Sequence, residues 1–328
     1  MKTGLAGFGA VTALAAACAC AVPSTDIEAY VLFFTSSLDF KGGNLAGTGY
    51  IDGGNVGVNR ADPNPGDNTI LMNVGANGRM VFTDPGQQLV ADSLRLGPEA
   101  VVFDVYRNYA AGSGWGTPGV VNGAVQGFSA PLINPLLLPA LAFAPGRAST
   151  EGAADVTVAA SATLAPGDYR DVQVQNGATL NLGDGVYNLR NLRTGQHATV
   201  NVTDGTILYI DGEYRLGDGS TFGVGTGSQA EVHVGSLGVG ANDRSVQFGE
   251  NAEAHGFFFA PNGGIGTSRK VDLFGRFWGD WFGSDFNLNV TFVPREASRV
   301  ADGGTTILLL GASLLGLGGL GWKSRPTR

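Results

Sequence analysis

Short stretches of alternating apolar and polar residues recur between residues 155 and 298. A period of two is typical of β-strands that bury one face. Asn-Gly, Asp-Gly and Gly-Asp-Gly sequences separate these stretches, and such residues favour tight turns. The pattern therefore predicts many short strands joined by turns. The alternating apolar positions are Val172, Val174, Leu180, Leu182, Val200, Val202, Leu208, Ile210, Phe222, Val224, Val232 and Val234.

The stretches also resemble one another. Residues 177–182 align with residues 197–202, twenty positions later, and in the same alignment Leu189 corresponds to Tyr209. A repeat of this length indicates a solenoid, in which stacked coils bury a core that no coil buries alone. We predict an all-β protein, folded as a right-handed parallel β-helix with coils of about 20 residues. An antiparallel sandwich or barrel is the alternative, since it also has closely spaced turns.

Composition divides the chain into further parts. Residues 22–110 show a looser version of the same pattern, which predicts early coils, and residues 155–298 hold the regular coils. Residues 111–154 are rich in glycine and proline, and Pro135 and Pro139 break their apolar stretch. Proline interrupts both strands and helices, so this part is predicted to be a loop or a capping segment.

The N-terminus has the features of a secretory signal peptide. Lys2 precedes an apolar run that ends in small residues at position 21, which predicts a signal peptide over residues 1–21 and an exported protein. Cys18 and Cys20 are the two cysteines of the chain and both lie in this segment. The rest of the chain therefore has no disulfide and no thiolate ligand.

The C-terminal segment, residues 299–328, has three parts: a short motif, an apolar stretch over residues 305–322, and basic residues at the end. This layout resembles bacterial sorting signals of the PEP-CTERM type, in the variant that reads Val-Pro-Asp-(Ser/Gly)-Gly. The resemblance implies cleavage by an exosortase-like sorting protease, with membrane contact only through a hydrophobic helix at 305–322. A permanent membrane anchor is the alternative. The motif residues are Val300, Ala301, Asp302, Gly303 and Gly304, with Ala301 in the place of proline.

The regular coils carry a second resemblance. Four segments resemble recurring coil motifs of a family of secreted bacterial β-helix proteins. They are residues 164–169, 185–189, 254–264 and 279–283. The resemblance covers about residues 155–292. It implies the fold, and it implies no established enzymatic activity.

Charge narrows the choice of partners. The chain has 53 glycines among 328 residues, and its net charge is −8. Residues 22–298 contain 27 acidic and 15 basic residues, a net charge of −12. Nucleic acid is therefore not expected as a partner, because phosphate binding needs a basic surface. No glycine pair is followed by Gly-Lys-Ser or Gly-Lys-Thr, so the glycines are interpreted as turn residues rather than phosphate loops.

Titratable residues form no recognisable catalytic or metal-binding motif. The aspartates of the coils mostly adjoin glycine, which is typical of turns, and the histidine spacings match no metal motif. We therefore predict no catalytic residue, no cofactor and no metal site. A weak ion site at Asp184 and Asp204 is the alternative. The residues concerned are Asp171, Asp184, Asp204, Asp211, Asp218, His197, His233 and His255.

Aromatic residues near the end of the coils allow two interpretations. Trp278, Trp281 and Phe282 are candidates for stacking on sugar rings, or else they close the core. The leading hypothesis is an exported, non-enzymatic structural or adhesive protein of the cell surface or extracellular matrix. A polysaccharide-binding or polysaccharide-cleaving β-helix is the alternative. A third hypothesis is a flat ice-binding face, which would use the threonines at 163, 179, 199 and 221.

Overall fold

The computed structural model describes residues 27–43, 49–61, 70–81, 87–102, 104–110, 120–121, 125–126, 154–225, 229–236 and 244–294. The predicted signal peptide at 1–21, the sorting segment at 299–328 and most of residues 111–154 lie outside these ranges. Within them the chain is all-β and its strand pairs are parallel, whereas an antiparallel sandwich would pair its strands in opposite directions. No helix in the described ranges is long and apolar enough to cross a membrane.

The regular coils form one run of stacked strands, which we call the C-terminal run. Each strand pairs with the strand one coil further on, as in a β-solenoid; Thr179 pairs with Thr199 and Val172 with Leu192. The strands are β13 (Val156–Val158), β14 (Ser161–Leu164), β15 (Gly167–Val174), β16 (Thr179–Leu182), β17 (Gly185–Thr194), β18 (Thr199–Val202), β19 (Thr206–Ile210), β20 (Tyr214–Leu216), β21 (Thr221–Phe222), β22 (Glu231–Val234), β23 (Arg244–Phe248), β24 (Glu253–Thr267), β25 (Asp272–Gly283) and β26 (Asn289–Phe292).

The predicted repeat is confirmed, with one correction. The alignment that paired Leu189 with Tyr209 is wrong by one residue, because Leu189 pairs with Ile210. Successive residues of a strand point to opposite sides, so this shift decides which side chain enters the core. Ile210 is buried and Tyr209 is only partly buried.

The N-terminal part of the chain forms a second run of coils, which we call the N-terminal run. It contains the 3-10 turn η1 (Ile27–Ala29), β1 (Tyr30–Phe40), β2 (Gly49–Asp52), β3 (Asn55–Val58), β4 (Met72–Val74), β5 (Gly78–Val81), β6 (Gln88–Val90), β7 (Ser93–Leu96), β8 (Val101–Val102), β9 (Asp104–Tyr106), β10 (Tyr109–Ala110), β11 (Val120–Val121) and β12 (Val125–Gln126). The last two strands, of two residues each, lie inside residues 111–154, the segment predicted as a loop or cap. The coils continue at least to Gln126, where β12 pairs with β9.

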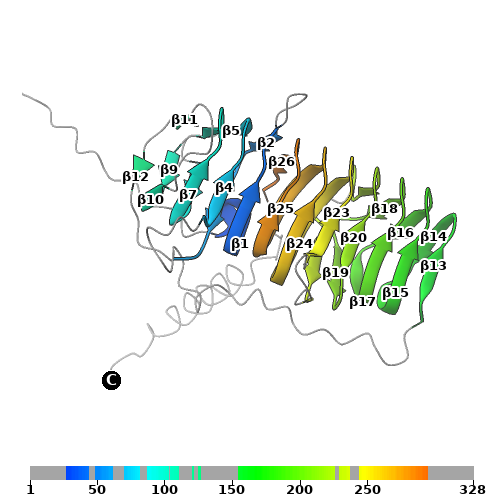
Figure 1. The fold of residues 1–328 in the computed structure, drawn as a ribbon. Helices are drawn as coiled ribbons and strands as arrows, with labels where there is room; N and C mark the ends of the chain where they lie inside the picture. Colours follow the sequence, from blue (N-terminus) through cyan, green and yellow to red (C-terminus); the bar gives the residue numbers. More distant parts are fainter. Residues whose placement is uncertain are drawn as a thin grey trace, which may run out of the picture.

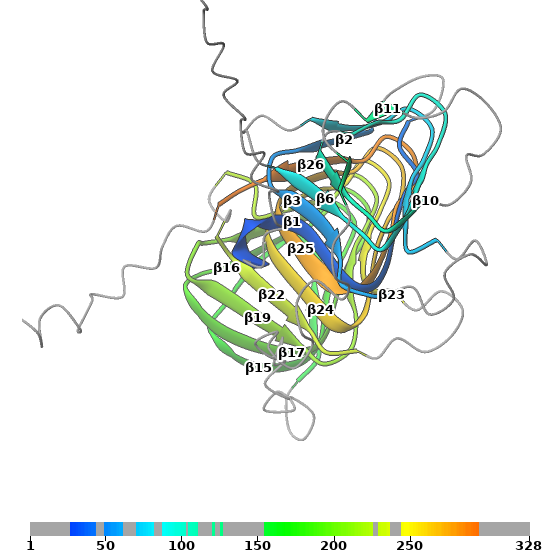
Figure 2. The ribbon, with the colours of Figure 1, turned by 90° about the vertical axis from the view of Figure 1, so that its left-hand side faces the viewer.

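The two runs stack in the reverse of their sequence order. β1 pairs with β25 on one side and with β3 and β4 on the other. The first strand of the chain therefore follows the last complete coil, and blue β1 lies beside orange β25 in Figure 1. Viewed along the axis, the coils superpose and show three sides (Figure 2). The described part of the chain thus forms one continuous stack, with β12 near one end and β13 at the other.

Inward-pointing side chains form one core through both runs. Along one side the successive buried residues include Leu192, Tyr214, Phe282 and Leu38, so the core crosses the junction without interruption. A smaller cluster lies on the outward side of β1, β24 and β25. Its members stand next to core residues on their strands, which include β6 and β9, yet they are buried too: Tyr30, Phe33, Val90, Tyr106, Phe257, Phe259 and Trp278.

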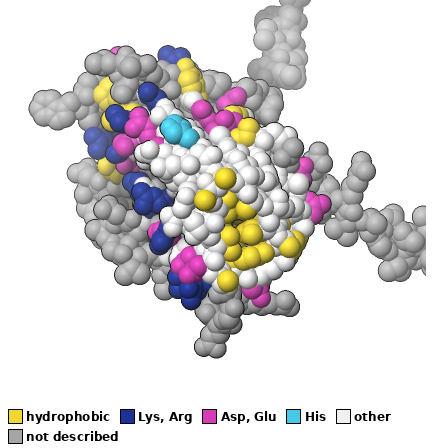
Figure 3. Space-filling view, turned by 90° about the vertical axis from the view of Figure 1, so that its right-hand side faces the viewer, with side chains coloured by type: hydrophobic (Ala, Val, Ile, Leu, Met, Phe, Trp, Pro, Cys, Tyr) yellow, Lys and Arg dark blue, Asp and Glu magenta, His cyan; other side chains and the backbone are white. Residues whose placement is uncertain are grey.

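The stack ends at β13 and β14, which pair with described strands on one side only. Val156, Ala162 and Leu164 are partly buried there and pack against the core. Figure 3 views this end and shows hydrophobic side chains in its middle, with Lys and Arg gathered along one side.

Candidate functional site

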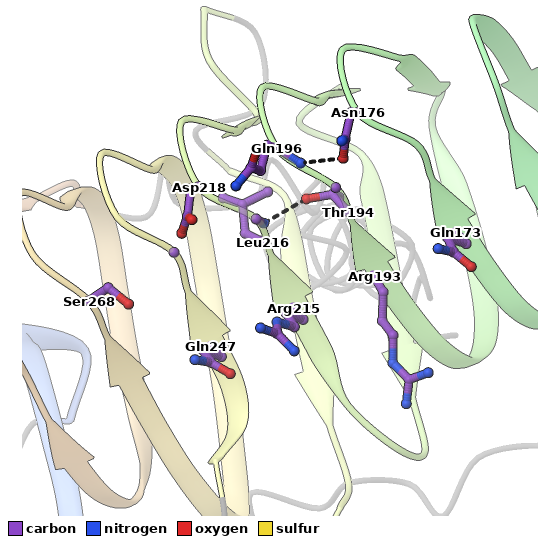
Figure 4. Close-up of a pocket in the computed structure, with 13 residues that line it drawn as sticks. Gln173, Asn176, Arg193, Thr194, Gln196, Arg215, Leu216, Asp218, Gln247 and Ser268 are labelled. Carbon is purple, nitrogen blue, oxygen red and sulfur yellow. Dashed lines mark hydrogen bonds between the residues drawn. The ribbon is translucent and has the colours of Figure 1, made fainter.

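A polar hollow on the outer surface of the C-terminal run is a candidate site. Its floor includes the outward row Gln173, Arg193, Arg215 and Gln247, contributed in order by β15, β17, β20 and β23. These residues stack in register, one per coil, and they are drawn in Figure 4. We call this hollow the polar groove; its volume is about 610 Å³.

Glycine creates the space beside this row. Gly195, Gly217 and Gly249 each follow the row residue of their coil by two positions, where the next outward side chain would stand. A Cβ on Gly217 would lie 2.2 Å from the carbonyl oxygen of Gly195. Larger residues cannot occupy these positions without moving the backbone, so the close approach of neighbouring coils keeps the hollow open.

Turn residues form the other wall. Asn176, Gln196 and Asp218 are exposed there, and each precedes a residue with positive φ. The Asn176 side-chain oxygen accepts a hydrogen bond from the Gln196 amide at 2.9 Å, and Asp218 accepts one from the Glu250 amide at 2.9 Å. These bonds fix the wall from coil to coil, as the dashed line between Asn176 and Gln196 shows in Figure 4.

A recurring sequence pattern, separate from the alternation of apolar and polar residues, marks this groove. Three coils share a pattern of five consecutive residues. The order is a residue of the outward row, an inward residue, a glycine, a polar residue and a residue with positive φ. The segments are residues 193–197 (Arg-Thr-Gly-Gln-His), 215–219 (Arg-Leu-Gly-Asp-Gly) and 247–251 (Gln-Phe-Gly-Glu-Asn). His197 is the positive-φ residue of its corner, with φ of 54°.

Most arginines near the groove are held in ion pairs. Arg170 donates to Asp155, and this hydrogen bond lowers the pKa of the Asp155 carboxyl to about 2. Arg190 donates to Asp171 of the preceding coil and lowers the pKa of that carboxyl. Each pair links neighbouring coils of the stack.

The two arginines of the groove differ in whether their charge is paired. Arg193 pairs with Glu213, so its charge is partly compensated. Arg215 is exposed and makes neither an ion pair nor a side-chain hydrogen bond within the ranges that the structure describes. A free guanidinium among amide side chains can hold a carboxylate or sulfate by two parallel hydrogen bonds.

The aromatic candidates have separate roles. Trp278 and Phe282 are 5% and 1% exposed, so neither can present a face to a sugar. The Trp278 indole nitrogen donates to the Tyr30 carbonyl at 3.0 Å, which ties β25 to β1. Trp281 is partly exposed, and its ring lies against the backbone of Gly264. A sugar-stacking role remains a prediction for Trp281 alone.

The other candidates remain dispersed. His233 and His255 lie beside Glu231 and Glu253, at 3.0 and 2.9 Å. Among the residues that the structure describes, no three His, Cys, Asp or Glu side chains gather as a metal site would require. Asp184 accepts a hydrogen bond from Thr203, and Asp204 accepts one from the Gln229 amide at 3.0 Å, so each has its own partner.

The threonine row is real but short. Three of the predicted threonines, Thr179, Thr199 and Thr221, stack in register, one per coil, and Ser161 precedes them. The prediction is wrong for Thr163, which pairs with Asn181 and lies outside the row. The next residue in the row is Glu253, which places a charge beside Thr221. The hydroxyl row therefore ends after four coils.

Comparisons with known proteins give no family for this chain, since no family model, no curated protein and no solved structure matches it.

Proposed function

We propose that the protein is an exported, non-enzymatic structural or adhesive component of the cell surface or extracellular matrix. In this proposal the solenoid is a right-handed parallel β-helix, a signal peptide over residues 1–21 directs export, and an exosortase-like protease acts at residues 300–304. Residues 305–322 provide the membrane segment before cleavage.

The observation that carries the proposal is the position of the two ends of the described chain. Glu28 forms an ion pair with the buried Arg276, and the Phe292 ring lies 5.6 Å from the same guanidinium. Both ends therefore leave the stack near one place, at the junction of the two runs. A membrane segment at residues 305–322 would hold the solenoid by its flank, which leaves its long faces exposed for contacts with other surface components.

Ladders of polar side chains support a scaffold role. Asn201 donates to the Asn181 side chain at 2.8 Å, and Asn188 donates to Asp168 at 2.6 Å, each across neighbouring coils. Exposed pairs of this kind add little stability singly, but a repeated row fixes the spacing of the coils. A rigid rod with regular polar faces suits a protein that connects other components of the cell surface or matrix.

Replacing Asp302 and Gly303 by alanine tests the sorting step. We expect the variant chain to remain uncut in the membrane fraction, with a higher mass than the wild-type product. Replacing Thr305 and Thr306 by alanine is the matched control, because it alters the chain just beyond the motif. Wild-type processing of the first variant would overturn the sorting proposal. Reproducible cleavage of a polysaccharide by the purified protein would overturn the non-enzymatic part.

The second candidate is a polysaccharide-binding role. The polar groove favours it, because the groove combines a free guanidinium with amide side chains that can bind hydroxyl groups.

A further inference from the structure

We propose that the polar groove binds a segment of acidic polysaccharide, and that Arg215 holds the carboxylate of a uronic-acid unit. This inference rests on the polysaccharide-binding role named above as the second candidate. It is independent of the sorting signal, so its failure and the failure of the sorting proposal can be told apart.

The uncompensated positive charge of the groove lies on Arg215. Arg193 already bonds to Glu213, whereas Arg215 stands free in the same row, and Gln173 and Gln247 flank the pair. Arginine binds a carboxylate through two parallel hydrogen bonds, a geometry that a hydroxyl group does not match. The groove therefore offers one strong anion position, at Arg215, in a polar surface whose other wall carries Asp218.

The shape of the groove suits an extended polymer. Neighbouring strands lie about 4.8 Å apart, so the four row residues span roughly 14 Å along the solenoid axis. Gln173, Gln247 and Gln196 supply donors and acceptors along this length, and the glycines beside the row leave space for a ring. A short stretch of linked sugars would meet amides at both ends and Arg215 near its middle.

The surroundings exclude a densely charged ligand. Asp218 lines the groove and Glu250 follows it in the next coil, and residues 22–298 carry a net charge of −12. Such a surface repels a polyanion that has a charge on every unit at close spacing. It tolerates a sparse one, in which a single carboxylate reaches Arg215 and the neighbouring units bind through their hydroxyls.

Calorimetric titration of the full chain tests the proposal with a trisaccharide that has one glucuronate unit between two neutral hexoses, and with its neutral methyl ester as the comparison ligand. We expect the acidic trisaccharide to bind, Arg215→Gln to weaken binding at least tenfold, and the ester to bind the wild-type protein as weakly as the acidic trisaccharide binds the variant. Affinity should also fall as salt rises, because the contact is exposed. Arg215 is on the surface, so the variant should keep the wild-type melting temperature.

Arg95→Gln is the matched control. Arg95 lies on β7 in the same outward row as Arg215, but in the N-terminal run and outside the groove. The Arg95→Gln variant should bind the acidic trisaccharide as the wild type does. Absence of binding to the wild-type chain, equal affinity for the ester, or an unchanged affinity of Arg215→Gln would each overturn the proposal. An equal loss in Arg95→Gln would assign the effect to overall charge and would overturn it as well.

Discussion

Phe34 lies at the junction between the two runs, which makes it the most informative residue to remove. It is fully buried on β1, its ring centre lies 5.3 Å from that of Phe282, and it pairs in register with Gly279 of β25. Phe34→Ala should lower the free energy of unfolding by about 3–5 kcal/mol, the cost of deleting a buried aromatic ring. Gly279 has no side chain that could refill the space, so the upper part of that range is expected.

Urea denaturation followed by tryptophan fluorescence measures this loss, because Trp278 and Trp281 lie on β25 beside β1. Phe286→Ala is the control. Phe286 is 38% exposed, so its replacement should change the free energy by no more than about 0.5 kcal/mol. A loss of unfolding free energy below about 1 kcal/mol for Phe34→Ala, or an equal loss in the control, would refute the packing of β1 against β25 at the junction of the runs.

A cross-link tests the same junction without changing the core. The Thr35 hydroxyl donates to Asp280 at 2.8 Å. In a chain with Cys18 and Cys20 replaced by serine, Thr35→Cys and Asp280→Cys should form a disulfide within one molecule on oxidation. Non-reducing electrophoresis would show it as a faster monomer band. Dimers, or two free thiols, would contradict the intramolecular pairing of β1 with β25.

Two further predictions concern single coils. Gly217→Ala should lower the free energy of unfolding by about 1–3 kcal/mol, because the new Cβ would lie 2.2 Å from a backbone oxygen. Gly183→Ala is the control, and it should be close to neutral in the same urea denaturation, because a Cβ there would have no atom within 4 Å. Arg170 lowers the pKa of Asp155 to about 2, so their pair stabilises the fold above about pH 4 and loses that effect as pH falls towards 2. The difference in melting temperature between wild type and Arg170→Gln should therefore shrink as pH falls from 4 towards 2. A difference of constant size over this range would contradict the prediction.

The repeat of the C-terminal run was predictable because it is local. Alternation places the side chains, and a shared period places one strand beside the next. The error at Leu189 shows the limit of alignment by similarity. The turn before β19 holds one extra residue, so a fixed offset of twenty pairs the wrong side chains. The alternation of Leu208 and Ile210 already carried the correct assignment, because both are buried and Tyr209 between them is not.

The groove was missed for a different reason. Glycine and aspartate at positions 217 and 218 were interpreted as turn residues, which they are, with Asp218 bonded to the next coil. Only stacking shows that Arg193 and Arg215 share a row and that Gly195 and Gly217 leave a hollow beside it. A motif search that included the row residue before each glycine would have found the recurrence.

The order of the runs could not be read from periodicity at all. A period states that coils stack, but it does not state which coil follows which. β1 gave one indication, since its first five residues, Tyr30 to Phe34, are all buried where a solenoid strand would alternate. Tyr30 and Phe33 belong to the outward cluster with Trp278, so β1 needs neighbours that lie more than two hundred residues away in the sequence.

This topology has a consequence for the order in which the strands pair during folding. β1 is the first strand made, yet one of its edges pairs with β25, near the end of the described chain. Contacts of such large sequence separation form late, because the whole intervening chain must be ordered first. The 29 residues between Gln126 and Val156 must also join strands at opposite ends of the stack. We therefore expect the contact between β1 and β25 to form only after the C-terminal run is complete, whereas β1 can pair with β3 and β4 earlier.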